Sequence, residues 1–241
     1  MSEQGAQQLR RLPGAHEVEQ AQRFCRDAEG LAGRPQPFQW QYGMAAVLGD
    51  AKQGWRMGGF TALAHFDAAK SRHSPEAKFP SPKFGHLFIA KSSGHPGRDA
   101  ASVMRWRAPS AASLQIGGQL KRSSPQGDGI RGFIFSDQRG LLAQCHIKGE
   151  GSAMLSARLE ARAGELFSLV VDRDGDTNSD GYQFNPRIER LTDDGSTALL
   201  SDSAQDFCDS SGWPINRTRP IAPLTQLAQV LLMSNEFMFV D

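Results

Sequence analysis

The stretch Gly129-Ile-Arg-Gly-Phe-Ile-Phe-Ser136 has the side-chain pattern that decides the fold of this chain. Successive side chains of a β-strand point to opposite faces of a sheet. Ile130 and Ile134 would therefore share one face, and Phe133 and Phe135 the other. A strand that is apolar on both faces is typical of the middle of a sheet, so we expect a loop or a neighbouring element to cover one of them.

Short segments of the same kind recur through the middle of the chain, each bounded by Gly, Pro, Asp, Asn or Ser. They are 84–90, 102–108, 113–120, 141–147, 154–160 and 165–172. One of them alternates cleanly, with Leu114 and Ile116 set against Gln115 and Gln119, as a half-buried strand would. Evenly spaced short strands with turn residues between them predict an antiparallel sandwich or barrel.

The two ends of the chain have helical patterns instead. Residues 16–33 combine good helix formers with apolar side chains at helical spacing, and residues 221–241 show a second apolar stripe. We therefore predict a mainly β fold: an antiparallel β-sandwich, of the jelly-roll and carbohydrate-binding-module-like type, flanked by short N- and C-terminal helices. The expected parts are an N-terminal helical segment (1–34), the β-sandwich domain (35–190), and a loop with the C-terminal helix (191–241).

The composition argues against several classes of protein. The 241 residues carry 27 Lys and Arg against 26 Asp and Glu, so the chain has no strong field to attract nucleic acid. No stretch approaches 18 apolar residues, so no membrane span is expected. The polar residues 1–13 lack the apolar core of a signal peptide, which taken alone indicates a cytoplasmic protein. Cys25, Cys145 and Cys208 form no C-x-x-C motif, and both a single disulfide and three free thiols stay open.

The densest polar cluster is the stretch 171–181, which follows an apolar strand. Ca²⁺ prefers six to eight oxygen ligands, so the cluster predicts a structural calcium site. The alternative is a solvated acidic turn that uses Asp and Asn for local hydrogen bonds. The helix–loop–helix calcium motif does not fit, because Thr177 and Gln183 stand where its Gly and Glu belong. The candidate metal ligands are Asp172, Asp174, Asp176, Asn178 and Asp180.

Two further loops combine glycine with polar residues. The turn 93–99 contains His95 and Arg98, which could bind a ligand or simply hold the turn together. The loop 124–132 resembles a glycine-rich phosphate loop only superficially, because a strand and no helix follows it. Surface tryptophans next to polar side chains suit the stacking of sugar rings, although core packing is the more frequent role of tryptophan. The candidate ligand-binding residues are Trp55, His95, Arg98, Trp106 and Arg131.

No catalytic set is recognisable in the sequence. The nucleophile motif G-x-S-x-G and the zinc motif H-E-x-x-H are both absent. Glu165 and Asp172 are a conceivable pair of glycosidase carboxylates, but strand periodicity does not place them at the separation and geometry that such a pair needs. We therefore do not expect an enzyme.

Several stretches resemble a known group of proteins. Residues 227–241 resemble the C-terminus of large planctomycete surface proteins, which begin with a cytochrome c-like domain, continue through helical domains and stop at Asn-Glu-Phe-x-x-Val-Asp. The middle of the chain resembles a domain found within the same proteins. The matching pieces are 40–43, 60–66, 94–97, 105–109, 126–132 and 171–187.

The resemblance implies a carbohydrate-binding-like jelly roll that acts as a non-catalytic appendage of an extracytoplasmic protein, periplasmic or at the cell surface. The implied partners are a polysaccharide or glycan, and helical or cytochrome domains of the same or a neighbouring protein. The family's haem motif has no counterpart in this chain, so no haem is expected here. Since a signal peptide is also missing, the chain resembles the C-terminal piece of such a protein, either as a fragment or as a separate open reading frame.

The function expected from these observations is carbohydrate or polysaccharide recognition by a binding module. The alternative is a structural or interaction domain that packs on a helical partner domain, since the apolar stripe in 221–241 exceeds the needs of one short helix.

Overall fold

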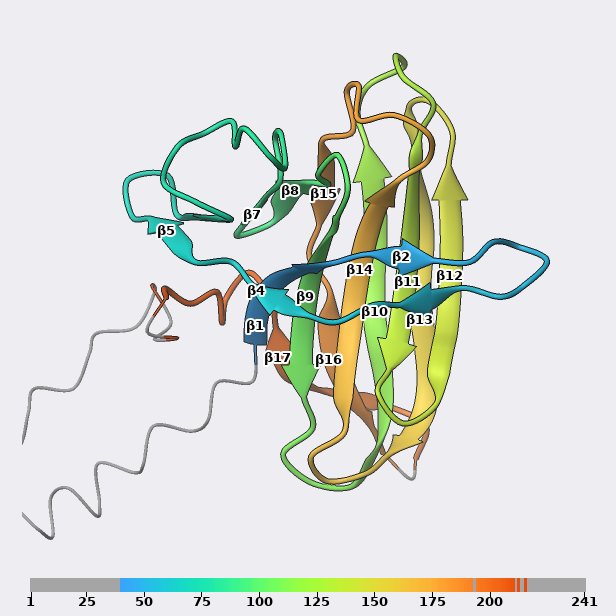
Figure 1. Cartoon of the computed structure of the whole chain (residues 1–241). Coiled ribbons are helices and arrows are strands. Elements are labelled where there is room, and N and C mark those ends of the chain that lie inside the picture. The colour runs from blue at the N-terminus through green and yellow to red at the C-terminus, as the bar shows by residue number, and fades with distance from the viewer. Residues whose placement is uncertain (1–39, 193, 211, 213–214, 216–241) are drawn as a thin grey trace, which may run out of the picture. The chain divides into compact units, whose positions relative to one another are not determined.

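The computed structural model describes residues 40–192, 194–210, 212 and 215, which belong to one compact unit. Within these residues the regular secondary structure is entirely β, and every strand pairing is antiparallel. The strands form two large sheets and one small two-stranded ribbon (Figure 1).

The first large sheet has six strands among the described residues. In spatial order they are β12 (Gly140–Ile147), β11 (Ile130–Ser136), β14 (Leu166–Arg173), β9 (Ala101–Arg107), β1 (Trp40–Ala45) and β4 (Thr61–Ala62). The ribbon consists of β2 (Val47–Leu48) and β3 (Arg56–Met57).

The second large sheet has nine strands among the described residues. Eight of them follow the order β17 (Thr197–Asp202), β16 (Arg187–Leu191), β10 (Ala112–Arg122), β15 (Tyr182–Phe184), β8 (Ser93–His95), β7 (Phe88–Ala90), β6 (Arg72–Ser74) and β5 (His65–Asp67). The ninth, β13 (Gly151–Ala161), pairs with β10 along its whole length.

The two large sheets pack face to face around one hydrophobic core. Ile134 of β11 and Leu169 of β14 belong to the same buried cluster as Ile116 of β10 and Leu155 of β13. The sheets approach closely at Gly132, where an added Cβ would lie 2.9 Å from a methyl carbon of Leu120 and 3.0 Å from one of Leu155. A larger residue here would require these leucine side chains to shift. The arrangement is an antiparallel sandwich, as predicted.

Part of the outer face of the six-stranded sheet is covered by residues 46–60, which contain the β2–β3 ribbon and run across β14, β11 and β12 (Figure 1). Phe133 and Phe135 of β11 form a second buried cluster there with Val103 and Val170. Side chains of the ribbon and its flanks, Trp55 among them, pack on that cluster. The prediction of a central strand with a covered second face is therefore confirmed for β11.

The other sequence predictions have mixed outcomes. Six of the seven predicted strands match observed strands within three residues at either end, whereas in 84–90 only 88–90 is a strand. The predicted loop after residue 190 contains β17, and Phe207 is fully buried as an anchor of this region. The thiols of Cys145 and Cys208 are both free. The two predicted helices lie outside the described residues, as does Cys25.

Candidate ligand-binding site

A hollow of about 540 Å³ opens where β10 changes its partner strand on one side. Over Leu114–Gly117 that partner is β16, and over Leu120–Arg122 it is β15. Gly118 and Gln119 lie between these two pairings and have no cross-strand partner on that side. The connection Asn185-Pro186 lies opposite them, and proline has no N–H to donate to the ladder. A gap in the sheet is the result.

The floor of the hollow is backbone. Gly117 has a φ of +135°, and a Cβ at this position would overlap the carbonyl oxygen of Leu155 on β13. Only glycine fits there. At Gly118 an added Cβ would lie 3.0 Å from the carbonyl oxygen of Asn185, so the absence of a side chain at this second glycine leaves the gap open. The residues that line the hollow are Ser92, Gly117, Gly118, Gln119, Lys121, Gln183, Phe184, Asn185 and Arg187.

The lining side chains lie on the solvent face of the sheet because of strand alternation. Leu120 and Phe184 point into the core, so Lys121 and Gln183 beside them are exposed. Lys121 and Gln183 are direct cross-strand partners on β10 and β15. Gln119 is exposed as well, and its amide nitrogen donates to the Ser152 hydroxyl at 3.2 Å. The rim therefore offers amide and ammonium groups to a ligand.

The opposite rim is held by the buried carboxylate of Asp202. It accepts hydrogen bonds from Nε of Arg187 at 3.1 Å and from the side-chain amide of Asn185 at 3.4 Å. Its second oxygen accepts the backbone N–H groups of Ala204 and Gln205 at 3.0 and 3.1 Å. With the carboxylate engaged in this way, Asn185 and Arg187 are fixed in place before any ligand arrives.

One end of the hollow is anchored by a buried ion pair. Arg122, the last residue of β10, lies 3.4 Å from the carboxylate of Asp180, and both side chains are fully buried. The guanidinium also donates to the backbone carbonyls of Ser124, Gln126 and Asn178, so it joins the two loops that follow β10 and β14. Burial raises the pKa of Asp180 to about 7, with the charge of Arg122 opposing the shift.

Four of the sequence-predicted residues, Trp55, Arg131, Asp172 and Asp174, lie together at a different place, beside the β2–β3 ribbon. Arg131 lies 3.4 Å from Asp172 and 3.7 Å from Asp174, and its guanidinium stands 4.7 Å from the centre of the Trp55 ring. His146 contacts the other oxygen of Asp174 at 2.9 Å. Two predicted ligand-binding residues, Trp55 and Arg131, therefore lie in one cluster with two predicted metal ligands, Asp172 and Asp174. We call this group the Arg131 cluster.

This cluster borders a second hollow of about 370 Å³, lined in part by Arg131, Asp172 and Asp174. Arg131 is largely occupied, because it also donates to the backbone carbonyls of Arg173 and Asp174. Trp55 has its ring against Arg131 and tilted on Phe133, with 5.3 Å between the ring centres. Burial raises the pKa of Asp172, and the charge of Arg131 opposes that shift. These contacts tie β11, β14 and the ribbon together.

The remaining acidic residues of 171–181 have separate partners. One oxygen of Asp176 accepts the backbone N–H of Asn178 at 2.7 Å, a local turn of the kind that Asp and Asn favour. Asp180 pairs with Arg122. Asp128 of the neighbouring loop accepts the N–H groups of Gly175 and Asp176. In the part of the chain that the structure describes, no group of three or more His, Cys, Asp or Glu residues is placed to hold a metal ion. The carboxylates therefore lie with separate partners in this arrangement, and the calcium site stays a prediction.

The other predicted ligand residues lie apart from both hollows. Trp106 is fully buried, and its ring stacks with Phe167 at 6.3 Å between the ring centres, so it presents no face to a ligand. Its prediction as a ligand residue needs correction: β9 places it inside the sandwich. His95 is half-buried, and its Nδ1 bonds the carbonyl of Pro96 at 2.6 Å. Arg98 is exposed on the same turn.

Glu165 and Asp172 do not form a catalytic pair. Glu165 directly precedes β14 and Asp172 lies near the far end of that strand, about 23 Å away at the rise of an extended strand. Glycosidase carboxylates stand about 5–10 Å apart. Glu165 is instead buried against Ser136 and Arg139, at 2.6 and 3.0 Å.

The residues that line the hollow on β10 were not predicted from the sequence. A signal for them is the Gly117-Gly118 pair with glutamines on either side, inside a segment that otherwise alternates cleanly. A glycine pair within a strand points to a bulge or to a close backbone approach.

No protein-family model matches this chain, and no curated protein matches it either. Among solved structures, the chain is similar to one described as "EclA C-terminal domain; sugar-binding protein", with 11% sequence identity and a TM-score of 0.29. The similarity covers 35% of this chain and 64% of that chain, so less than two thirds of that chain is spanned. Within the described residues, no helix has the length and apolar character needed to cross a membrane.

Proposed function

We propose that this chain is a non-catalytic, jelly-roll-type binding module that recognises a carbohydrate in the hollow on β10. The observation that carries the proposal is the lining of that hollow, where three side-chain amides, two cations and a serine surround a floor of bare glycine backbone. On the resemblance to planctomycete surface proteins, the module would serve a larger extracytoplasmic protein.

The chemistry of this lining suits sugar hydroxyls. A hydroxyl both donates and accepts a hydrogen bond, and the amides of Gln119, Gln183 and Asn185 also carry both kinds of group. Lys121 and Arg187 add donors only. The groups are spread along β10 over an open gap, which suits a chain of sugar units that enters from the side.

The same lining supports binding rather than hydrolysis. Most glycosidases place two carboxyl groups on either side of the scissile bond. The residues that line the hollow include no Asp, Glu or His. The carboxylate next to it, Asp202, is buried and already accepts four hydrogen bonds.

Affinity electrophoresis of the full chain through gels that contain neutral or acidic polysaccharides tests the proposal. We expect retention by at least one polysaccharide, and loss of that retention in the variants Gln119→Ala and Gln183→Ala. Gln144→Ala is the matched control, because Gln144 is an exposed glutamine on β12 and does not line the hollow. Circular dichroism would verify that all three variants fold. Absence of retention on every polysaccharide would contradict the proposal.

A further inference from the structure

We infer that the hollow on β10 selects an acidic glycan, whose chain lies along β10 with one anionic unit at Lys121 and another at Arg187. This inference rests on the proposed function and names the substrate class of the same site. It comes from the charge of the lining and from the spacing of the two cations.

The charge of the lining is entirely positive. Lys121 is exposed, and none of the ion pairs or hydrogen bonds among the described residues engages its ammonium group. Arg187 is 56% exposed and uses Nε for Asp202, whereas Asp202 itself is only 3% exposed. The buried carboxylate holds the arginine through Nε and offsets part of its charge, while the exposed side of the guanidinium faces the hollow. An anionic ligand therefore meets two cations and no opposing charge on the lining residues.

The spacing of the cations defines the length of the ligand. Arg187 pairs across the sheet with Gly117, and Lys121 lies four residues further along β10. This corresponds to about 13 Å at the rise of an extended strand. This is a separation of backbone positions, and Asp202 holds the guanidinium of Arg187 through Nε. An oligosaccharide with two acidic units matches this spacing better than one carboxylate or sulfate group, with its hydroxyls over Gly117-Gly118 and beside Gln119 and Gln183.

Both cations are exposed, so their contribution is screened by salt. An exposed ion pair contributes up to about 1 kcal/mol, which is roughly a fivefold change in affinity. We therefore expect an acidic chain to bind more weakly as ionic strength rises, while a purely hydrogen-bonded neutral chain would respond little.

Isothermal titration of the full chain with saccharides of matched backbone tests the inference. The probes are tetragalacturonate, its methyl ester, which has the same backbone without charge, and monomeric galacturonate. We expect the tetramer to bind, the methyl ester to bind at least about fivefold more weakly, and the monomer to bind more weakly than both. Salt should weaken the tetramer most.

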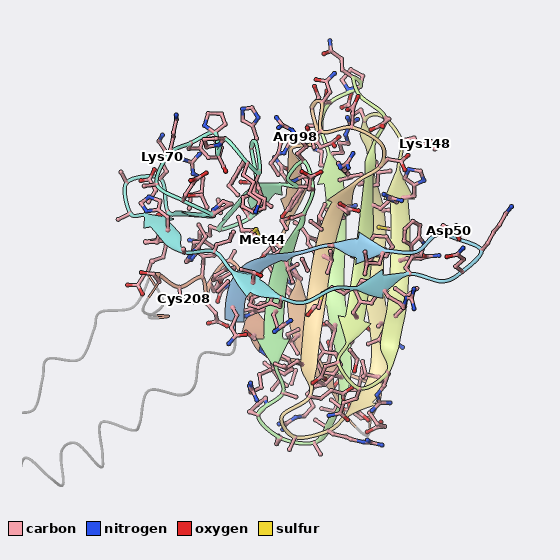
Figure 2. All side chains as sticks on the ribbon, viewed as in Figure 1. Met44, Asp50, Lys70, Arg98, Lys148 and Cys208 are labelled. Atoms are coloured by element: carbon pink, nitrogen blue, oxygen red, sulfur yellow. The ribbon has the colours of Figure 1, made fainter. Side chains whose placement is uncertain are left out.

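Variants assign the effect to the hollow. Lys121→Gln should weaken tetragalacturonate about fivefold and leave the methyl ester unchanged. Lys70→Gln is the charge-matched control, since Lys70 is an exposed residue on the β5–β6 turn and lies well away from β10 (Figure 2). Arg187→Gln should act as Lys121→Gln does, provided that its melting temperature confirms that the Asp202 contacts can be lost without unfolding.

The outcomes separate this inference from the proposed function. Equal binding of the tetramer and its methyl ester would overturn the acidic selectivity and leave carbohydrate binding intact. Equal binding of monomer and tetramer would overturn the two-cation arrangement. Binding of neither, together with no retention in polysaccharide gels, would overturn the proposed function itself. If Lys121→Gln and Lys70→Gln weaken the binding of tetragalacturonate equally, the effect comes from the overall charge of the protein, and the acidic glycan does not bind in the hollow on β10.

Discussion

The guanidinium of Arg122 and the carboxylate of Asp180 form a fully buried ion pair, 3.4 Å apart, at the junction of the two loops beside the candidate site. Arg122 also donates hydrogen bonds to three backbone carbonyls in these loops, those of Ser124, Gln126 and Asn178. A buried charge that loses its partner is strongly destabilising.

Arg122→Met is therefore expected to lower the free energy of unfolding by about 3 kcal/mol or more, because Asp180 and three carbonyls lose their donor. Urea unfolding at pH 7 measures the change. Arg107→Met is the control, since Arg107 is an exposed arginine at the end of β9. A loss no larger than that of the control would show that the pair contributes nothing to the loops.

The same pair predicts a dependence of stability on pH. Burial raises the pKa of Asp180 to about 7, above its ordinary value near 3.8. Between these two values the unfolded chain releases the proton that the folded chain keeps, so this group makes folding less favourable as pH rises from about 4 to about 7. Unfolding free energies across this range should fall with rising pH in the original chain. This component of the slope should vanish in Asp180→Asn, and an unchanged slope would contradict the raised pKa.

Glu165 should show the opposite behaviour. Burial would raise its pKa, but hydrogen bonds from Ser136, the backbone N–H of Arg162 and Arg139 outweigh that effect, and the net pKa is lowered. Its stabilisation is therefore present above the ordinary glutamate pKa and is lost as pH falls through the lowered value. Glu165→Gln should cost about 1–3 kcal/mol at pH 7 and much less at an acidic pH below the lowered pKa. Thermal unfolding at both pH values is the measurement, and an equal cost at both would argue against the lowered pKa.

A variant of Trp55 tests which of the two hollows binds the sugar. Its ring covers part of the Phe133 cluster and contacts Arg131, so Trp55→Ala should lower the free energy of unfolding by about 2 kcal/mol. Because Trp55 does not line the hollow on β10, retention in polysaccharide gels should not change at temperatures where the variant is folded. Trp55→Phe keeps most of the packing and serves as control. Loss of retention in a folded Trp55→Ala protein would move the sugar site to the Arg131 cluster.

Calcium gives a further test of the acidic stretch. Asp172 and Asp174 are already paired with Arg131 and His146, so a cation would have to displace those side chains. We expect the melting temperature to stay the same in calcium and in EDTA. A rise in calcium that EDTA reverses, and that Asp176→Asn abolishes, would establish the calcium site indicated by the sequence.

The alternation of apolar and polar side chains in short segments was enough to predict most strands of the sandwich. In β11 both faces are apolar, and each face meets its own cluster of buried side chains. The strands of residues 40–74 were harder to predict, because several of them have only two or three residues and no room for a periodic pattern.

The candidate site was beyond prediction for a different reason. Lys121, Gln183 and Arg187 are ordinary exposed polar residues in the sequence, and they share a site only because β15 and β16 pair in succession with β10. Register across a sheet is a long-range property that no local pattern encodes. Trp106 shows the converse, since a tryptophan next to arginines in sequence can still face the core.

The β2–β3 ribbon determines which face of the protein is open to a large binding partner. It takes up part of the outer side of the six-stranded sheet, with aromatic groups of the chain itself already pressed onto that side. The glycine gap on β10 opens on the nine-stranded sheet, so the two outer faces of the sandwich differ. A polymer bound in the hollow on β10 would leave the face with the β2–β3 ribbon free to contact another domain or protein.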